Sequence, residues 1–147
     1  MSINKLIKEA SARGVTRMVL TDVNNSTGVM EFIRKCRKSE SIIPLCGIEF
    51  RRDKKLLYIC ISRNREGMRE LNEFLTEHNL EKKVLPDQPP LFRHAFVVYP
   101  FGHEGTLAPN DFLGIRADEL HLLYNKDITD IKNKLLVLQP VVCIRPH

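Results

Sequence analysis

The stretch that decides the fold reads RMVLTDVNNSTGVMEFIRKCRKSESIIPLCGIEF, from Arg17 to Phe50. Two short apolar runs within it, residues 17–21 and 42–48, have the length of buried strands. Between them Val29, Phe32, Ile33 and Cys36 recur at the spacing of one helical face. A strand, a helix and a second strand in this order predict parallel strand pairing, with the helix packed outside the sheet.

The same alternation continues on both sides of this stretch. Before it, Ile3, Leu6, Ile7 and Ala10 predict a helix that Ser2 caps and Gly14 ends in a left-handed turn. After it we expect a turn at Asp53 and Lys54, a strand over 56–61 and a helix that begins after 63–67 and buries Met68, Leu71 and Leu75. Further strands are predicted at 95–99, 112–115 and 135–138, a short helix at 117–124, and an apolar end at 141–144. The expected fold class is α/β with mostly parallel strands.

The length of 147 residues suits one domain over 1–147, with a possible subdivision at the proline-containing loop 86–90. Apolar residues make up 43% of the chain, which is enough for a buried core. No run approaches the roughly 20 apolar residues of a membrane span, and the N-terminus does not resemble a signal peptide. We therefore expect a cytoplasmic protein.

The cysteines and histidines do not form a recognisable metal motif. The four cysteines lack the C-x-x-C spacing of a zinc site and are expected to be buried free thiols. No two histidines have the i, i+4 spacing of a helical zinc pair, and each is expected to be a surface or loop residue. The cysteines are Cys36, Cys46, Cys60 and Cys143, and the histidines are His78, His94, His103, His121 and His147.

Two carboxylates lie where the first two predicted strands end, Asp22 and Glu49. Catalytic residues in parallel α/β folds gather at the carboxyl ends of strands, so both are candidate metal ligands. The alternatives are structural: Asp22 can cap the next helix, and Glu49 can form an ion pair with Arg51, Arg52 or another base.

The most basic stretch runs over residues 51–69. Arg51, Arg52, Lys54 and Lys55 lie in it and are the candidate contacts to a nucleic-acid backbone. A solvated hairpin tip and a solvated helix start are the favoured explanation of this stretch. The net charge of +5 permits a phosphate-rich partner without requiring one.

Several of these stretches, in this order, resemble the N-terminal PHP (polymerase and histidinol phosphatase) domain of bacterial DNA polymerase III alpha subunits. The segments are Leu20-Thr21-Asp22, then Ser26-Thr27-Gly28-Val29, then Ile43-Pro44-Leu45-Cys46-Gly47-Ile48-Glu49-Phe50, and Ser62-Arg63-Asn64-Arg65-Glu66-Gly67-Met68-Arg69-Glu70-Leu71-Asn72. The last is similar to the family's RNxEGxxxL segment. Beyond residue 90, Phe112-Leu113-Gly114-Ile115-Arg116 and Leu138-Gln139-Pro140-Val141 resemble the family more loosely.

The resemblance implies a distorted (β/α)7 barrel, of which this chain would be an incomplete part within a larger polymerase. It also implies Zn, Mn or Mg ions at the carboxyl ends of the strands in active members. The family's second motif, Thr-Asp-His, here reads Thr21-Asp22-Val23, and the third motif's glutamate matches Glu49. Its first motif would lie upstream of the first helix. We therefore expect a degenerate metal site that binds no cofactor tightly.

The leading functional hypothesis is a structural and interaction domain in DNA replication, partnered by the rest of the alpha subunit and, in the parent protein, by DNA. The alternative is an active metal-dependent phosphoesterase or 3′–5′ proofreading exonuclease. A general nucleic-acid-binding module is less favoured, because aromatic residues are only 7% of the chain and tryptophan is absent. A barrel fragment would also expose strand edges, so we expect the isolated chain to form homo-oligomers.

Overall fold

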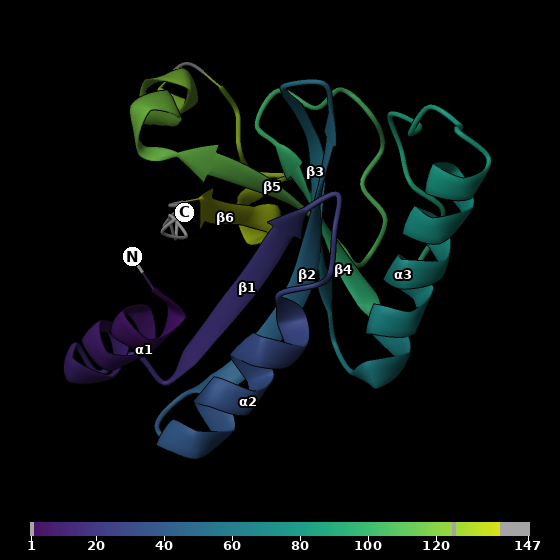
Figure 1. Ribbon diagram of the computed structural model, residues 1–147. Coiled ribbons are helices and arrows are strands. Elements are labelled where there is room, and N and C mark those ends of the chain that lie inside the picture. The colour runs from purple at the N-terminus through teal and green to yellow at the C-terminus, as the bar shows by residue number, and fades with distance from the viewer. Residues whose placement is uncertain (1, 125, 139–147) are drawn as a thin grey trace.

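The computed structural model describes residues 2–124 and 126–138 (Figure 1). The chain begins with α1 (Ile3–Ala12), β1 (Arg17–Val23), α2 (Val29–Ser39) and β2 (Ile43–Arg52). It continues with β3 (Lys55–Ser62), α3 (Arg65–Leu80), β4 (Ala95–Pro100) and β5 (Asp111–Arg116). Two 3-10 helices follow, Ala117–Leu123 and Lys132–Lys134, before β6 (Leu135–Leu138). Every strand and helix predicted within the described residues is present; the apolar residues 141–144 lie outside them.

One sheet contains all six strands in sequence order, β1-β2-β3-β4-β5-β6, and it curls into a half-barrel (Figure 1). This mixed α/β arrangement is consistent with part of a PHP-type barrel. The expectation of mostly parallel strands is wrong, because β3 runs antiparallel to both β2 and β4. The tight turn at Asp53, whose φ of 56° is left-handed, accounts for the β2–β3 pair, because a turn this short can only join antiparallel strands.

The helices cover one face of this sheet, which we call the helix face. Two apolar clusters lie beneath them. In one, Phe32 and Cys36 of α2 pack with Ile7 of α1 and Cys46 of β2. In the other, Leu71 and further residues of α3 pack on β2, β3 and β4. Burial of these side chains is the main source of stability of the fold.

The opposite face, which we call the open face, carries the alternate residues of each strand. Pairing places Val19, Thr21 and Val23 of β1 beside Leu45, Gly47 and Glu49 of β2. Near β1 this face is half exposed, with Val23 at 50%. Near β4 it is enclosed by the curl, since Val98 and Leu138 fill the space above Gly114. The edge of β1 away from β2 has no strand partner among the described residues; self-association of the chain stays a prediction.

Both ends of α1 are formed by the residues that the sequence predicts. The Lys5 N–H donates to Ser2 Oγ at 3.3 Å, so Ser2 caps α1 as predicted. Gly14 follows the helix with a φ of 76°, which is also as predicted. Within the described residues, no helix has both the length and the apolar character needed to cross a membrane.

Candidate functional site

The carboxyl ends of β1 and β2 are tied together by the turn that leaves β1. Asn24 adopts a left-handed φ of 46°, and its backbone N–H donates to the Glu49 carbonyl at 2.9 Å. Its side chain accepts a hydrogen bond from the Arg51 N–H and donates to the Arg51 carbonyl, both at 2.9 Å. This short turn fixes the geometry of the two candidate carboxylates.

Asp22 lies near the end of β1 and caps α2. Its Oδ2 accepts a hydrogen bond from the Gly28 N–H at 2.8 Å. Gly28 is the N-cap residue of α2 and has no side chain to satisfy the helix's first N–H groups. Asp22 therefore supplies the negative charge that a helix N-terminus favours, which is the structural alternative expected for this residue.

Glu49 forms an ion pair within its own strand. Its Oε1 lies 2.8 Å from the guanidinium of Arg51, and both side chains are partly buried. Arg51 also donates to the Lys54 carbonyl at the hairpin tip. Glu49 thus has the basic partner that was the alternative to a metal.

The strand register separates these two carboxylates. Asp22 pairs with Ile48, whereas Glu49 pairs with Val23. Side chains alternate across a sheet, so Asp22 lies on the helix face with Ile48, while Glu49 and Val23 lie together on the open face. The residue opposite Glu49 is therefore an apolar valine. Asp22 and Glu49 do not converge, and this pair does not fit a shared metal ion.

A wider search of the described residues, with gaps at 1, 125 and 139–147, finds no group of three or more His, Cys, Asp or Glu side chains placed to hold a metal ion. The candidate ligands Asp22 and Glu49 stay predictions as metal ligands, and so does the expectation that no cofactor is tightly bound.

The four basic candidates on the β2–β3 hairpin divide into two kinds. Arg51 forms the ion pair with Glu49 described above. Arg52 donates to the Leu85 carbonyl and lies 2.9 Å from the Asp87 carboxylate. Lys54 and Lys55 are exposed. The two arginines thus have protein partners, and only the two lysines extend freely from the hairpin. Their contact to nucleic acid stays a prediction.

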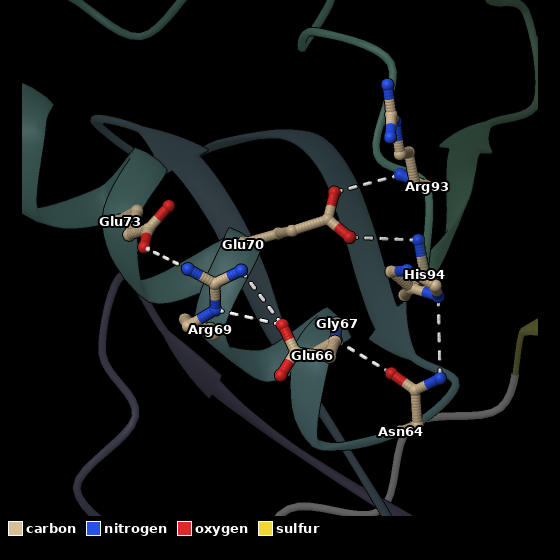
Figure 2. A network of polar contacts seen from close by, with 8 residues as sticks. All are labelled: Asn64, Glu66, Gly67, Arg69, Glu70, Glu73, Arg93 and His94. Carbon is tan, nitrogen blue, oxygen red and sulfur yellow. Dashed lines mark hydrogen bonds and ion pairs between the residues drawn. The ribbon is translucent and has the colours of Figure 1, made fainter.

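The residues that sequence reasoning missed lie at the start of α3 (Figure 2). Asn64 Oδ1 accepts a hydrogen bond from the Gly67 N–H at 3.0 Å and caps the helix. One turn later, the Glu70 carboxylate accepts hydrogen bonds from the backbone N–H groups of Arg93 and His94, at 2.8 and 3.0 Å. A Cβ on Gly67 would lie only 2.1 Å from the His94 carbonyl oxygen.

These contacts fasten the segment before β4 to the first turns of α3. Glycine is required at position 67 because the backbone of residue 94 approaches so closely. Asn64, Gly67 and Glu70 of the RNREGMRE sequence thus have structural roles. No local pattern could have indicated Glu70, since its partners lie more than twenty residues away in sequence.

Three of the cysteines, Cys36, Cys46 and Cys60, are buried free thiols, as expected. Burial raises the pKa of Cys46 to about 11 and also raises the pKa of Cys36 and of Cys60. These thiols are therefore uncharged at neutral pH and unsuited to nucleophilic chemistry. Cys143 lies outside the described residues.

His103 lies in a loop after β4, as expected, but its side chain is only partly exposed. Its ring stacks on Tyr99 at a centroid distance of 3.8 Å, and its Nε2 is buried without a hydrogen-bond partner among the described residues. Desolvation lowers the pKa of His103, and the nearby Asp111 opposes that effect. The neutral form of His103 is favoured by its packing.

A search of curated proteins finds no match to the chain. A family model, described as the PHP domain, matches residues 1–99, which extend from α1 to β4. That match covers more than half of the chain and supports a PHP-family, phosphoesterase-like role. It agrees with the curled α/β half-barrel and with the order of the motifs. The chain belongs to the PHP domain family.

Proposed function

We propose that this chain is the PHP unit of a bacterial DNA polymerase III alpha subunit, and that it serves there as a structural and interaction domain without metal-dependent catalysis. The observation that carries the proposal is the placement of Asp22 and Glu49 on opposite faces of the sheet. A catalytic metal site takes at least three protein ligands as a rule, and they must lie on the same side.

Each carboxylate is also engaged in the architecture. Asp22 binds the first turn of α2, and Glu49 binds Arg51. Moving either to a metal would break a contact that organises the ends of β1 and β2. The polymerase assignment is supported by the order and spacing of the family-like segments, above all residues 62–72, which here form the fastening at the start of α3.

The second candidate is a metal-dependent phosphoesterase or 3′–5′ exonuclease. Family membership favours it, and so does the position of Glu49 on the open face near a strand's carboxyl end. Its chemistry would need a metal ion to activate water. Val23, opposite Glu49, contributes no ligand, and this weighs against it.

The deciding experiment uses the native polypeptide that carries this sequence, purified through an affinity tag placed in its gene. Its mass, primer extension and hydrolysis of a single-stranded DNA 3′ end with Mn²⁺ or Zn²⁺ are measured for the wild type and for Glu49→Gln. The proposal expects primer extension that Glu49→Gln leaves unchanged, and no hydrolysis. Hydrolysis that Glu49→Gln abolishes, or a polypeptide without polymerase activity, would contradict it.

A further inference from the structure

A groove on the outside of the half-barrel collects basic side chains from two helices. It runs between α1 and α2, which lie next to each other (Figure 1), and has a volume of about 590 Å³. Its polar lining is contributed by Asn4, Lys8, Ser11, Lys35, Lys38, Ser39 and Ser41. No aspartate or glutamate lines it. The groove therefore presents mainly hydrogen-bond donors and positive charge.

The cations in this groove are only partly compensated. Lys35 forms an ion pair with Glu31 at 2.6 Å, but Lys8 and Lys38 are exposed and have no ion pair within the described part of the chain. Arg34 and Arg37 flank the groove around a neighbouring hollow on α2. Residues 1–41 contain eight basic and four acidic residues, so most of the chain's net charge of +5 arises here.

Helix stability alone does not account for this arrangement. Arg37 and Lys38 lie in the last turn of α2, where cations stabilise the helix dipole. Lys8 lies on a different helix, and the fold brings it to the same groove as Lys38. Two exposed ammonium groups without an ion pair in the described residues therefore line one groove from different helices, and an anion bound there could contact both.

We propose that the α1–α2 groove binds the sugar-phosphate backbone of double-stranded nucleic acid. Ammonium, hydroxyl and amide groups are the side chains that contact phosphates, and all three kinds line the groove. No aromatic side chain lines it, so it offers no platform on which the bases of a single strand could stack. This binding does not depend on the nucleotide sequence and weakens as the salt concentration rises. This inference does not rest on the proposed polymerase role.

The test is fluorescence anisotropy of a labelled DNA duplex of arbitrary sequence, titrated with the full chain over a series of KCl concentrations. Lys8→Gln/Lys38→Gln is compared with Lys54→Gln/Lys55→Gln, which removes the same charge from the exposed hairpin tip. The groove variant is expected to weaken binding at least tenfold at low salt. Its slope of log K against log salt should fall by about 2, since each lost phosphate contact removes about 0.9. The hairpin variant should keep the wild-type slope.

Further arms of the titration identify the ligand. Lys8→Arg/Lys38→Arg should restore binding, and an RNA duplex should compete, whereas single-stranded DNA and polyglutamate should bind more weakly than the DNA duplex. Thermal unfolding confirms that each variant is folded, which is expected because these lysines are exposed. The proposal is overturned if the wild type does not bind the duplex or if polyglutamate binds as tightly as DNA. It is also overturned if both double substitutions reduce the slope equally, or if only the hairpin substitution reduces it.

Discussion

The helix face and the open face of the sheet use the same strands in different ways. On the helix face, Ile48 of β2 is fully buried beneath α3, whereas Ile43, on the open face of the same strand, is 55% exposed. The helix face also holds the buried thiols Cys46 and Cys60 and the helix-capping Asp22. The open face near β1 holds Val23 and the Glu49–Arg51 pair.

The two faces therefore contribute differently to the stability of the fold and to the surface that is free for interaction. The helix face is densely packed, so changes there should weaken folding. The open face near β1 is incompletely covered, so it tolerates change and is available to a further layer of protein. The two candidate carboxylates, Asp22 and Glu49, belong to these two different regions.

The largest difference between the two faces is expected from a matched pair of substitutions in β2. Ile48→Ala should lower the free energy of unfolding by about 2–5 kcal/mol, because it leaves a cavity in a closed core. Ile43→Ala, the same chemical change on the open face, should cost less than about 1 kcal/mol. Urea unfolding followed by circular dichroism measures both. Equal losses would show that the open face is covered in solution.

A second substitution tests the fastening between α3 and β4. Glu70→Ala should lower the free energy of unfolding by about 1–3 kcal/mol, since two backbone N–H groups lose a charged acceptor. The amides of Arg93 and His94 should also exchange with deuterium faster. The control is Glu73→Ala on the same helix, which removes only the exposed ion pair with Arg69 and should lower the stability far less than Glu70→Ala. Unchanged exchange at residues 93 and 94 would contradict this role.

A smaller effect is expected at the cap of α2. Asp22→Ala should cost about 0.5–2 kcal/mol, as for other lost N-caps, because Gly28 has no side chain to replace the acceptor. Asp22→Asn keeps an acceptor oxygen and should recover most of the loss. The readout is the urea midpoint together with the exchange rate of the Gly28 amide. If both variants match the wild type, Asp22 does not cap the helix.

The smallest expected effect is the pH dependence due to His103 on the helix face. Its folded-state pKa is lowered from 6.5, so the stability that its neutral form contributes is complete above pH 6.5 and declines as the pH falls below that value. His103→Gln should flatten the dependence of the urea midpoint on pH between 7.5 and 5.5. His121→Gln is the control. A wild-type slope retained in His103→Gln would show that His103 is solvated in the folded state.

Local patterns predicted most of this fold. Apolar spacing placed α1, α2 and α3, and short apolar runs placed the strands, because both signals reflect a single buried face. Apolar runs do not specify the pairing directions: the two-residue turn at Asp53 and Lys54 makes β3 antiparallel to β2. Asp22 and Glu49 lie near the ends of β1 and β2, as predicted, although β2 continues three residues beyond Glu49, to Arg52. That they face opposite ways depends on a one-residue difference in register, which the sequence of either strand alone does not contain.

Whether Asp22 and Glu49 share a metal ion is tested most directly by titrating the purified chain with Zn²⁺ and Mn²⁺ in a calorimeter. Elemental analysis after gel filtration follows. Wild type, Asp22→Ala and Glu49→Ala are measured side by side. Because Asp22 and Glu49 lie on opposite faces, we predict that no metal is retained in stoichiometric amount and that the three isotherms agree. One ion per chain in the wild type, lost in both variants, would show that the two carboxylates bind one metal ion together, contrary to this prediction.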